Sequence, residues 1–320
     1  MLLWLWPVPL PRHSPQELAG TRGWIGRYFR RPPDLRGLML CRAAAATSDV
    51  LLLGAVITLL QIEPVVAAVL GILGLIVSVQ AATMRADYRR HLDEALPRPT
   101  DREVDAALAG HLLDIENRAL TVLGLRPADI VATGTTWNPI ADLEHRPHRN
   151  GERDYRPLIV VTPMVTTRSA IGSDGVWRFA AQEVTVICPT EYHVAVFRCE
   201  QDLITGKRRG EQTQEFFYRD VVSVLTANLP GPDLTSEPFD HRSEGRVPIS
   251  PPGRRELQFA APSTDRTMVA VGVTGRSSGA RIRDSGIDAA IEGVRNLLRV
   301  MRRPPDSVRT APGRAERPAQ

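Results

Sequence analysis

The stretch at residues 50–80, VLLLGAVITLLQIEPVVAAVLGILGLIVSVQ, decides how the rest of this chain is interpreted. A helix crosses the hydrocarbon layer of a bilayer with about 20 apolar residues, so one helix of this whole length is too long for a single upright span. Gln61, Glu63 and Pro64 interrupt the run, and proline removes a backbone donor and disfavours helix in the residue before it. We therefore expect a turn here that divides the run into two helices.

The two halves of this run differ in character. Residues 65–84 contain no charge and are long enough to span a membrane alone, whereas the first half reaches a full span only by including residues 43–49. Asp49 then lies about two turns from the expected helix start, where a carboxylate can face headgroups or water at lower cost than at the bilayer centre. A buried helical hairpin in a soluble core is the alternative that the sequence leaves open.

Arginine residues flank both halves, while the expected turn carries only the acid Glu63. Those before the first half are Arg27, Arg30, Arg31, Arg36 and Arg42, and those after the second are Arg85, Arg89 and Arg90. The positive-inside rule then predicts a multi-pass inner-membrane protein with both termini and its main domain in the cytoplasm. The dominance of arginine over lysine, with many Ala, Gly and Pro, indicates a GC-rich bacterial genome.

Small and aromatic residues add detail to the expected hairpin. Its small residues can let the two helices approach closely, as in other membrane proteins; they are Gly54, Gly71, Gly74, Ala67 and Ala68. Before the first span, Trp24, Tyr28 and Phe29 are interleaved with arginines. That segment suits an interfacial position at headgroup level, and an ordinary loop explains it equally well.

Composition excludes some classes of function. With 320 residues and a formal net charge of +4, the chain is no candidate for nucleic-acid binding through a broad basic face. Cys41, Cys188 and Cys199 form no close-spaced metal pattern, and we expect buried, reduced thiols. We expect no cofactor and no metal.

A single amphipathic helix is predicted after the hairpin. Thr100 and Glu103 have the spacing of a capping box, and Gly124 stands where the helix ends. Apolar residues recur every three or four positions between them, namely Val104, Leu108, Leu112, Ile115, Ala119 and Val122. We expect this stripe to pack on the domain that follows, with His111 packed beside it.

The remaining chain has the pattern of short strands followed by one helix. The expected strands are residues 157–167, 177–187, 192–200, 211–219, 221–227, 256–261 and 267–273. A helix then opens at residues 285–288, with Ile287, Ile291, Val294, Leu298 and Met301 along one face. This order is typical of a small, strongly bent antiparallel sheet capped by a terminal helix.

Four segments of this region carry a family resemblance. EFFYRDVVSVLTA (215–227), RELQFAA (255–261), TMVAVGV (267–273) and IDAAIEGVRNLLRVM (287–301) together resemble bacterial pleckstrin-homology-like (PH-like) and GRAM-like domains. The resemblance covers about residues 176–303 and rests on pattern, with an aromatic residue and an aspartate before a V-x-x-V strand. A Pro-rich insertion at residues 229–254 departs from the family and puts the strand count in doubt.

The expected fold class is therefore α+β: a transmembrane helical hairpin, an amphipathic helix and a PH-like antiparallel β-domain with a C-terminal helix. The predicted domains are an N-terminal basic and aromatic segment (1–42), the hairpin (43–84), a cytoplasmic helical linker (85–127), the β-domain (128–303) and a disordered tail (304–320).

No catalytic motif in the sequence is complete. Residues 275–279 fit the G-x-S-x-G elbow, but no histidine follows His241 to activate the serine, so a Gly- and Ser-rich loop explains the match better. Glu144, His145 and His148 lie in a Pro- and Arg-containing loop without a helix to align the imidazoles, so we expect no metal site there. An enzyme with a cryptic site is the alternative; its candidate residues are Asp174, Glu183, Glu191 and His193.

One basic turn is the candidate contact site. Lys207, Arg208 and Arg209 are adjacent cations between two expected strands, which can touch anionic lipid headgroups or an acidic protein face, although a solvated turn is the simpler interpretation. We expect a membrane-anchored, non-enzymatic interaction module whose partners are the bilayer and an unidentified protein. The sequence gives neither the process nor the oligomeric state.

Overall fold

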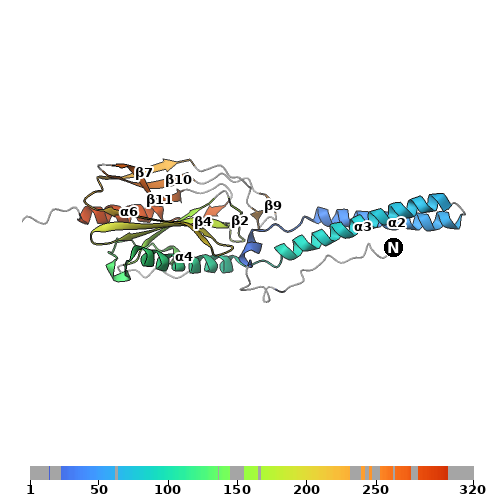
Figure 1. The fold of residues 1–320 in the computed structure, drawn as a ribbon, viewed down its shortest axis with the longest axis horizontal. Helices are drawn as coiled ribbons and strands as arrows, with labels where there is room; N and C mark the ends of the chain where they lie inside the picture. Colours follow the sequence, from blue (N-terminus) through green and yellow to red (C-terminus); the bar gives the residue numbers. More distant parts are fainter. Residues whose placement is uncertain are drawn as a thin grey trace, which may run out of the picture. The chain divides into compact units, whose positions relative to one another are not determined.

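The computed structural model describes Ser14 and residues 23–61, 64–135, 137–144, 155–164, 167–230, 239–241, 245–246, 253–261, 264–274 and 280–301. Two long apolar helices form a hairpin and are followed by a further helix, antiparallel β-sheets and a C-terminal helix (Figure 1). This order confirms the expected α+β class. The chain divides into two compact units, residues 1–104 and 105–320.

The hairpin of the first unit consists of α2 (Leu35–Leu60) and α3 (Pro64–Ala95). The expected turn is confirmed, because α2 ends at Leu60 and α3 begins at Pro64, a residue whose fixed φ suits the first helical position. Residues 62–63, including Glu63, lie outside the described residues. At 1.5 Å per residue the helices are about 39 and 48 Å long, which exceeds the hydrocarbon layer of about 30 Å.

Both helices extend well beyond the apolar run at the end away from the turn. There, Leu38 on α2 packs with Tyr88 and Leu92 on α3 in a small apolar cluster, which keeps the charged last turns of α3 helical. The longer α2 also changes the position of Asp49. We expected this residue near a helix end, but it lies near the middle of the 26-residue helix, so that expectation was wrong.

The seam between α2 and α3 contains small residues, as expected, although Ala68 is exposed while Ala67 is buried. A Cβ placed on Gly74 lies 2.9 Å from Cδ2 of Leu52, whereas a Cβ on Gly71 lies 3.9 Å from Cβ of Ala55. The hydroxyl of Ser48, 3% exposed, donates a hydrogen bond of 2.9 Å to the carbonyl oxygen of Gly74. The closest approach is therefore at Gly74, where one helix presents backbone to the other.

The aromatic segment before the hairpin is a packed 3-10 turn, η2 (Ile25–Phe29). Tyr28 and Phe29 are buried and their rings lie edge to face, 5.2 Å apart. The Tyr28 hydroxyl donates to Asp101 Oδ1 at 2.7 Å, and Arg27 Nη1 donates to the carbonyl oxygen of Leu96 at 2.7 Å. This segment is therefore a packed turn and not an ordinary loop, and its position at the membrane interface stays a prediction.

Two antiparallel sheets form the body of the second unit. One has the order β1 (Leu158–Pro163), β4 (Ala181–Pro189), β5 (His193–Asp202), β6 (Arg208–Phe217), and the other β11 (Thr264–Thr274), β10 (Gly253–Ala261), β7 (Ser223–Leu229). Figure 1 shows α6 (Ile287–Met301) against both of them. The main core contains side chains of β1, β4 and β5, of β10 and β11, and the apolar face of α6. Six of these seven long strands and the terminal helix were expected, whereas β4 was expected only as part of a longer strand at 177–187.

A third sheet was missed by the sequence. It has the order β12 (Arg281–Ile282), β3 (Val176–Phe179), β2 (Ser169–Ile171), β8 (Phe239–Asp240), β9 (Gly245–Arg246). Its strands are too short to show alternation, and β8 and β9 come from the Pro-rich insertion that put the strand count in doubt. The single strand expected at 177–187 was wrong, because the chain changes sheet at Ala180.

The amphipathic helix is α4 (Asp101–Leu123). Its capping box is confirmed, since the backbone N–H of Thr100 donates to Glu103 Oε2 at 2.6 Å and that of Glu103 donates to Thr100 Oγ1 at 3.3 Å. Gly124 ends it with φ +66°. The apolar stripe is confirmed except at Val122, which is 41% exposed, while Leu120 is buried. Two short helical segments, η3 (Pro127–Asp129) and α5 (Pro139–Leu143), follow.

Candidate functional site

The hairpin presents an apolar surface that no other described part of the chain covers. Its exposed large apolar residues include Val50, Leu53, Val56, Ile57, Leu59 and Leu60 on α2, and Val65, Val69, Ile72, Leu75, Ile76, Val79 and Met84 on α3. Only 6% and 17% of the apolar windows of α2 and α3 are buried within the structure, whereas a core helix of a soluble protein is mostly buried. The two helices are therefore candidate membrane spans.

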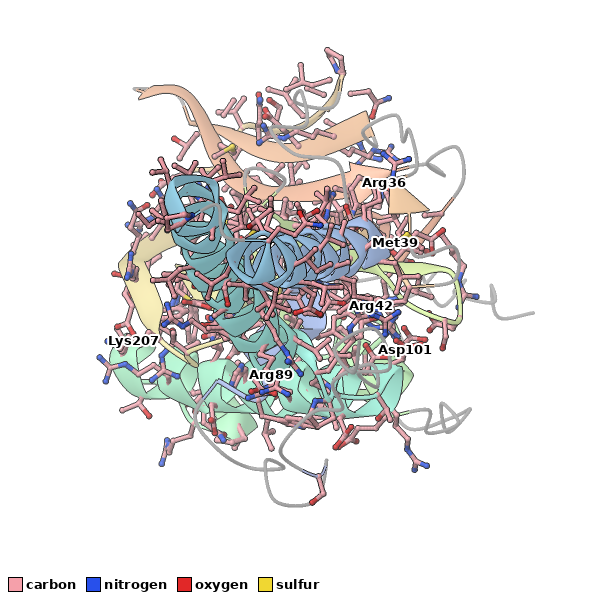
Figure 2. The ribbon with its side chains drawn as sticks, turned by 90° about the vertical axis from the view of Figure 1, so that its right-hand side faces the viewer. Arg36, Met39, Arg42, Arg89, Asp101 and Lys207 are labelled. Carbon is pink, nitrogen blue, oxygen red and sulfur yellow. The ribbon has the colours of Figure 1, made fainter. Side chains whose placement is uncertain are left out.

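The basic flanks lie together at one end of this hairpin. Figure 2 labels Arg36 and Arg42 on α2 and Arg89 on α3. Because the helices are antiparallel and Gly37 contacts the ring of Tyr88, these arginines share the end opposite the turn. The arginines lie on both outer flanks of the apolar run in the sequence, and the hairpin brings these flanks to the same end. If the hairpin spans a membrane, cations at that end can meet lipid phosphates.

A single charged residue, Asp49, lies within the described residues 43–60 and 64–84. Its side chain is half-buried and makes no hydrogen bond or ion pair with any residue that the structure describes. An acid at the centre of a bilayer costs about 2.5–3.5 kcal/mol on insertion scales. This carboxyl is therefore an energetic anomaly of the hairpin if α2 spans a membrane.

The predicted basic turn is well ordered by its own hydrogen bonds. The carboxylate of Asp202 accepts from the backbone N–H of Ile204 at 2.9 Å and from the Thr205 hydroxyl at 2.7 Å, and Gly206 has φ +69°. Lys207 alone lies in the turn, because β6 begins at Arg208. Figure 2 shows Lys207 at the outer edge of the turn between β5 and β6.

One of the three cations of the basic turn has an ion pair, and a second lies opposite an acid on the neighbouring strand. Arg208 Nε lies 3.6 Å from Glu211 Oε1, and Arg209 is paired in register with Glu200 on β5. Successive strand residues point to opposite faces, so Arg208 and Arg209 do not form a patch on one face. The ammonium group of Lys207 has no ion pair among the described residues. Whether these three cations bind anything stays a prediction.

His111 of α4 packs beneath the same turn. Its Nδ1 lies 3.3 Å from Gln201 Nε2, and a Cβ on Gly206 would lie 3.3 Å from its Nε2. Burial lowers the pKa of His111 below its ordinary value, so the imidazole is neutral at neutral pH. The expectation of a packed histidine is confirmed.

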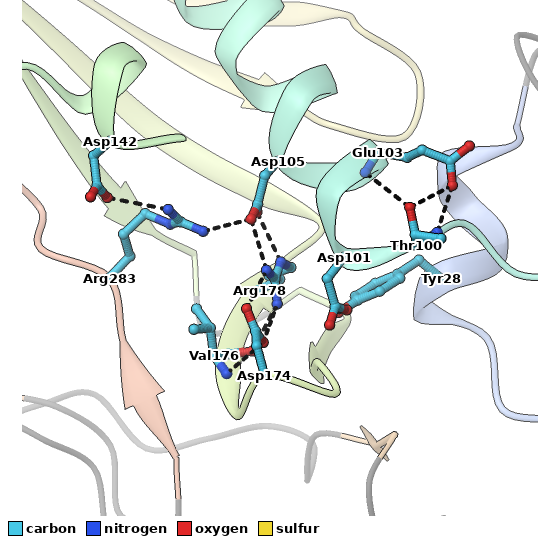
Figure 3. A network of polar contacts seen from close by, with 10 residues as sticks. All are labelled: Tyr28, Thr100, Asp101, Glu103, Asp105, Asp142, Asp174, Val176, Arg178 and Arg283. Carbon is cyan, nitrogen blue, oxygen red and sulfur yellow. Dashed lines mark hydrogen bonds and ion pairs between the residues drawn. The ribbon is translucent and has the colours of Figure 1, made fainter. Parts of the chain in front are cut away.

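A buried ion-pair network that no sequence motif indicates crosses the second unit (Figure 3). Arg178 on β3, with a side chain 5% exposed, donates from Nε and Nη2 to both carboxylate oxygens of Asp105 on α4, at 2.9 and 2.8 Å. The same guanidinium donates from Nη1 and Nη2 to Asp174 at 2.9 and 2.8 Å. One arginine thus holds α4 and the β2–β3 turn together.

Arg283 extends this network to α5. Its Nη2 donates to Asp105 Oδ2 at 2.8 Å and its Nη1 to Asp142 Oδ2 at 3.2 Å. Burial raises the pKa of Asp174, but hydrogen bonds from Arg178 and from the backbone N–H of Val176 outweigh it and lower that pKa to about 2. Apart from Asp174 and Arg178, which are four residues apart, the members lie far apart in sequence, so only the fold brings them together. Their arrangement fits a structural clamp.

The four residues of the enzyme alternative do not converge. Asp174 belongs to the network, and Glu183, near the start of β4, forms an ion pair of 2.7 Å with Arg198. Glu191 and His193 lie beyond the other end of β4, whose last residue, Pro189, is about 20 Å from Glu183 at 3.3 Å per strand residue. His193 Nδ1 contacts the hydroxyl of Thr190 at 3.0 Å.

The cysteines are free and buried, as expected. Burial raises the pKa of Cys188 to about 12 and that of Cys199 to about 11, so neither thiol is an activated nucleophile at neutral pH. Within the part of the chain that the structure describes, no group of three or more His, Cys, Asp or Glu side chains can hold a metal ion. His145, His148 and the serine motif at 275–279 lie outside the described residues.

A scan against models of protein families found no match, and searches of curated proteins and of solved structures found none either.

Proposed function

We propose that this chain is a membrane-anchored interaction protein of the bacterial inner membrane, in which α2 and α3 cross the bilayer as a hairpin. Both ends of the hairpin and the β-domain lie in the cytoplasm. The β-domain presents its surface to a protein partner or to anionic lipid. The chain performs this role without catalysis, and the partner determines the cellular process in which the chain takes part.

The observation that carries this proposal is the exposed apolar surface of the hairpin, with arginines at one end. Exposed apolar patches of this extent are rare on soluble monomers and mark contact with a membrane or a protein. Arginines concentrate on the cytoplasmic side of membrane proteins, which supports the orientation. The turn end of the described hairpin, residues 50–61 and 64–79, carries no charge.

The proposal treats the β-domain as PH-like. Its two main antiparallel sheets and the helix α6 support this assignment, because a bent antiparallel sheet capped by a terminal helix is what the resemblance implies. The third sheet is an addition to that pattern. The division at residues 42, 84, 127 and 303 stays a prediction.

Fractionation and topology reporters test the anchoring. The full chain is expected in the membrane pellet after alkaline carbonate washing and in the supernatant only with detergent. A phosphatase reporter, active only outside the cytoplasm, is expected to be inactive when fused at Gln320 and active when inserted after Gln61. A chain that stays in the supernatant without detergent refutes the anchor, and an active reporter at Gln320 refutes the orientation.

Vesicle binding distinguishes lipid from protein as the target of the basic turn. The triple variant Lys207→Gln, Arg208→Gln, Arg209→Gln is compared with a matched variant in which the exposed Arg126, Arg219 and Arg299 become Gln. Lipid binding predicts that only the first variant recruits fewer anionic vesicles to the immobilised chain, and that salt weakens recruitment. Equal recruitment by both variants rules out this turn as a lipid site and leaves a protein partner.

A further inference from the structure

We propose that Asp49 is the point at which two copies of this chain associate within the membrane, through the face of α2 that lies beside its seam with α3. This inference rests on the proposed membrane anchoring and adds an oligomeric contact to it.

The depth of Asp49 is the first step of the argument. It lies about 16 Å along the axis from Leu60, the last residue of α2, at 1.5 Å per residue. With the turn at one surface of a hydrocarbon layer about 30 Å thick, Asp49 lies close to the midplane. Arg42, by the same arithmetic about 27 Å from Leu60, reaches the opposite boundary, where it can meet headgroups.

The direction of Asp49 is the second step. Ser48 points into the seam with α3, where its hydroxyl donates to the carbonyl oxygen of Gly74. The next residue on a helix is rotated by about 100°, so Asp49 lies on the flank of α2 beside the seam, which agrees with its half-burial. No residue that the structure describes forms a hydrogen bond or ion pair with it. Within the described residues, the Asp49 carboxyl therefore makes no polar contact that stabilises the hairpin.

The residues around Asp49 form a face suited to a second helix. Positions three, four and seven residues away share its side of α2. Ala45 and Ala46 are small and permit close approach of another backbone, while Leu53 and Val56 are 61% and 56% exposed and can pack in the contact. This combination of small residues with one polar group is typical of helix contacts in membranes.

A second copy is the occupant that the chemistry favours. A two-fold axis along the membrane normal brings residues of equal depth together, so Asp49 meets Asp49 of the other copy. Two carboxyl groups that meet can share a hydrogen bond in which one donates and the other accepts, without any other partner. The described apolar parts of α2 and α3 contain no cation that could pair with Asp49 from a copy at the same depth.

Disulfide crosslinking of the full chain in its native membranes tests the proposal. Val56→Cys places a thiol on the proposed face, and Thr47→Cys, on the opposite side of α2, is the matched control. The native cysteines are buried, so the chain without a new cysteine serves as background. We expect an oxidised dimer with Val56→Cys and only background with Thr47→Cys.

The role of the carboxyl is tested in the Val56→Cys chain. Asp49→Leu is expected to weaken association about tenfold, and Asp49→Asn, which can still donate and accept, is expected to retain it. Equal crosslinking with Asp49→Leu, equal crosslinking at both cysteine positions, or a crosslink to a different protein overturns the proposal. Membrane pelleting of each variant is measured in parallel, so that a failed anchor is distinguished from a failed contact.

Discussion

Replacing Arg178 with methionine tests whether the buried network clamps the second unit. Arg178 and Asp105 have side chains that are each 5% exposed, and four hydrogen bonds of 2.8–2.9 Å join Arg178 to Asp105 and Asp174. Methionine keeps most of the length of the side chain but supplies no donor. The variant therefore leaves the carboxylate of Asp105 buried with Arg283 as its remaining partner.

The expected loss follows from that stranded charge. Removing one partner of a buried ion pair typically costs about 3–5 kcal/mol. Because Arg283 still contacts Asp105 at 2.8 Å, we expect a value near the lower end, about 3 kcal/mol. Adding Asp105→Leu removes the stranded carboxylate, so the double variant is expected to lose less stability than the sum of the two single variants.

Guanidinium unfolding of the full chain in mild detergent, followed by near-ultraviolet circular dichroism, measures this free energy. Arg30→Met is the control, because Arg30 and Glu94 form an exposed pair with side chains 42% and 48% exposed. Such pairs contribute about 0–1 kcal/mol. The clamp interpretation fails if Arg178→Met costs no more than Arg30→Met, or if the losses at Arg178 and Asp105 are additive.

Three further predictions follow from local geometry and charge. Gly74→Val is expected to destabilise the hairpin by about 1–3 kcal/mol through overpacking, measured by thermal unfolding in detergent. Gly71→Ala is expected to change its stability little, because a Cβ there lies 3.9 Å from its nearest neighbour. Equal losses of stability would contradict the close packing at Gly74. At pH 8, Cys188 and Cys199 are expected to react with a thiol reagent only after the chain unfolds, because burial raises the pKa of both thiols. Rapid labelling of these two cysteines in the folded chain would refute their burial. Since the pKa of Asp174 is lowered from 3.8 to about 2, its contribution to stability is present above about pH 4 and is lost as the pH falls to about 2. The Asp174 side chain is 38% exposed, so after allowance for solvent screening we expect it to contribute about 1 kcal/mol to the free energy of unfolding. This contribution is measured by comparing the acid-induced loss of stability of the native chain with the smaller loss expected for Asp174→Asn.

The elements that the sequence predicted well are those set by local chemistry. The turn at Pro64, the capping box of Thr100 and Glu103, and the helix end at Gly124 each depend on a few neighbouring residues. Long periodic segments such as α6 also carry their own signal, because a stripe of apolar residues recurs at every turn.

Helix length and the roles of single residues were harder to predict. The apolar run ends at Met84, but α3 continues to Ala95 because its charged turns pack through Tyr88 and Leu92 against α2. That longer hairpin also moved Asp49 from an expected helix end to the middle of a helix. Contacts with another helix determine where a helix ends and where a residue lies along it. The hydropathy of a single segment does not predict these contacts.

By itself the sequence determined the order of the long helices and strands, the apolar hairpin and its basic flanks, because periodicity, caps and charge are local properties of the chain. Only the tertiary structure decided that five charged residues between Asp105 and Arg283 form one network and that the chain changes sheet at Ala180. It also decided that Ser48, and not Asp49, lies in the seam with α3. The physical reason is that these features depend on which distant side chains meet, and burial then fixes whether a charge must be paired.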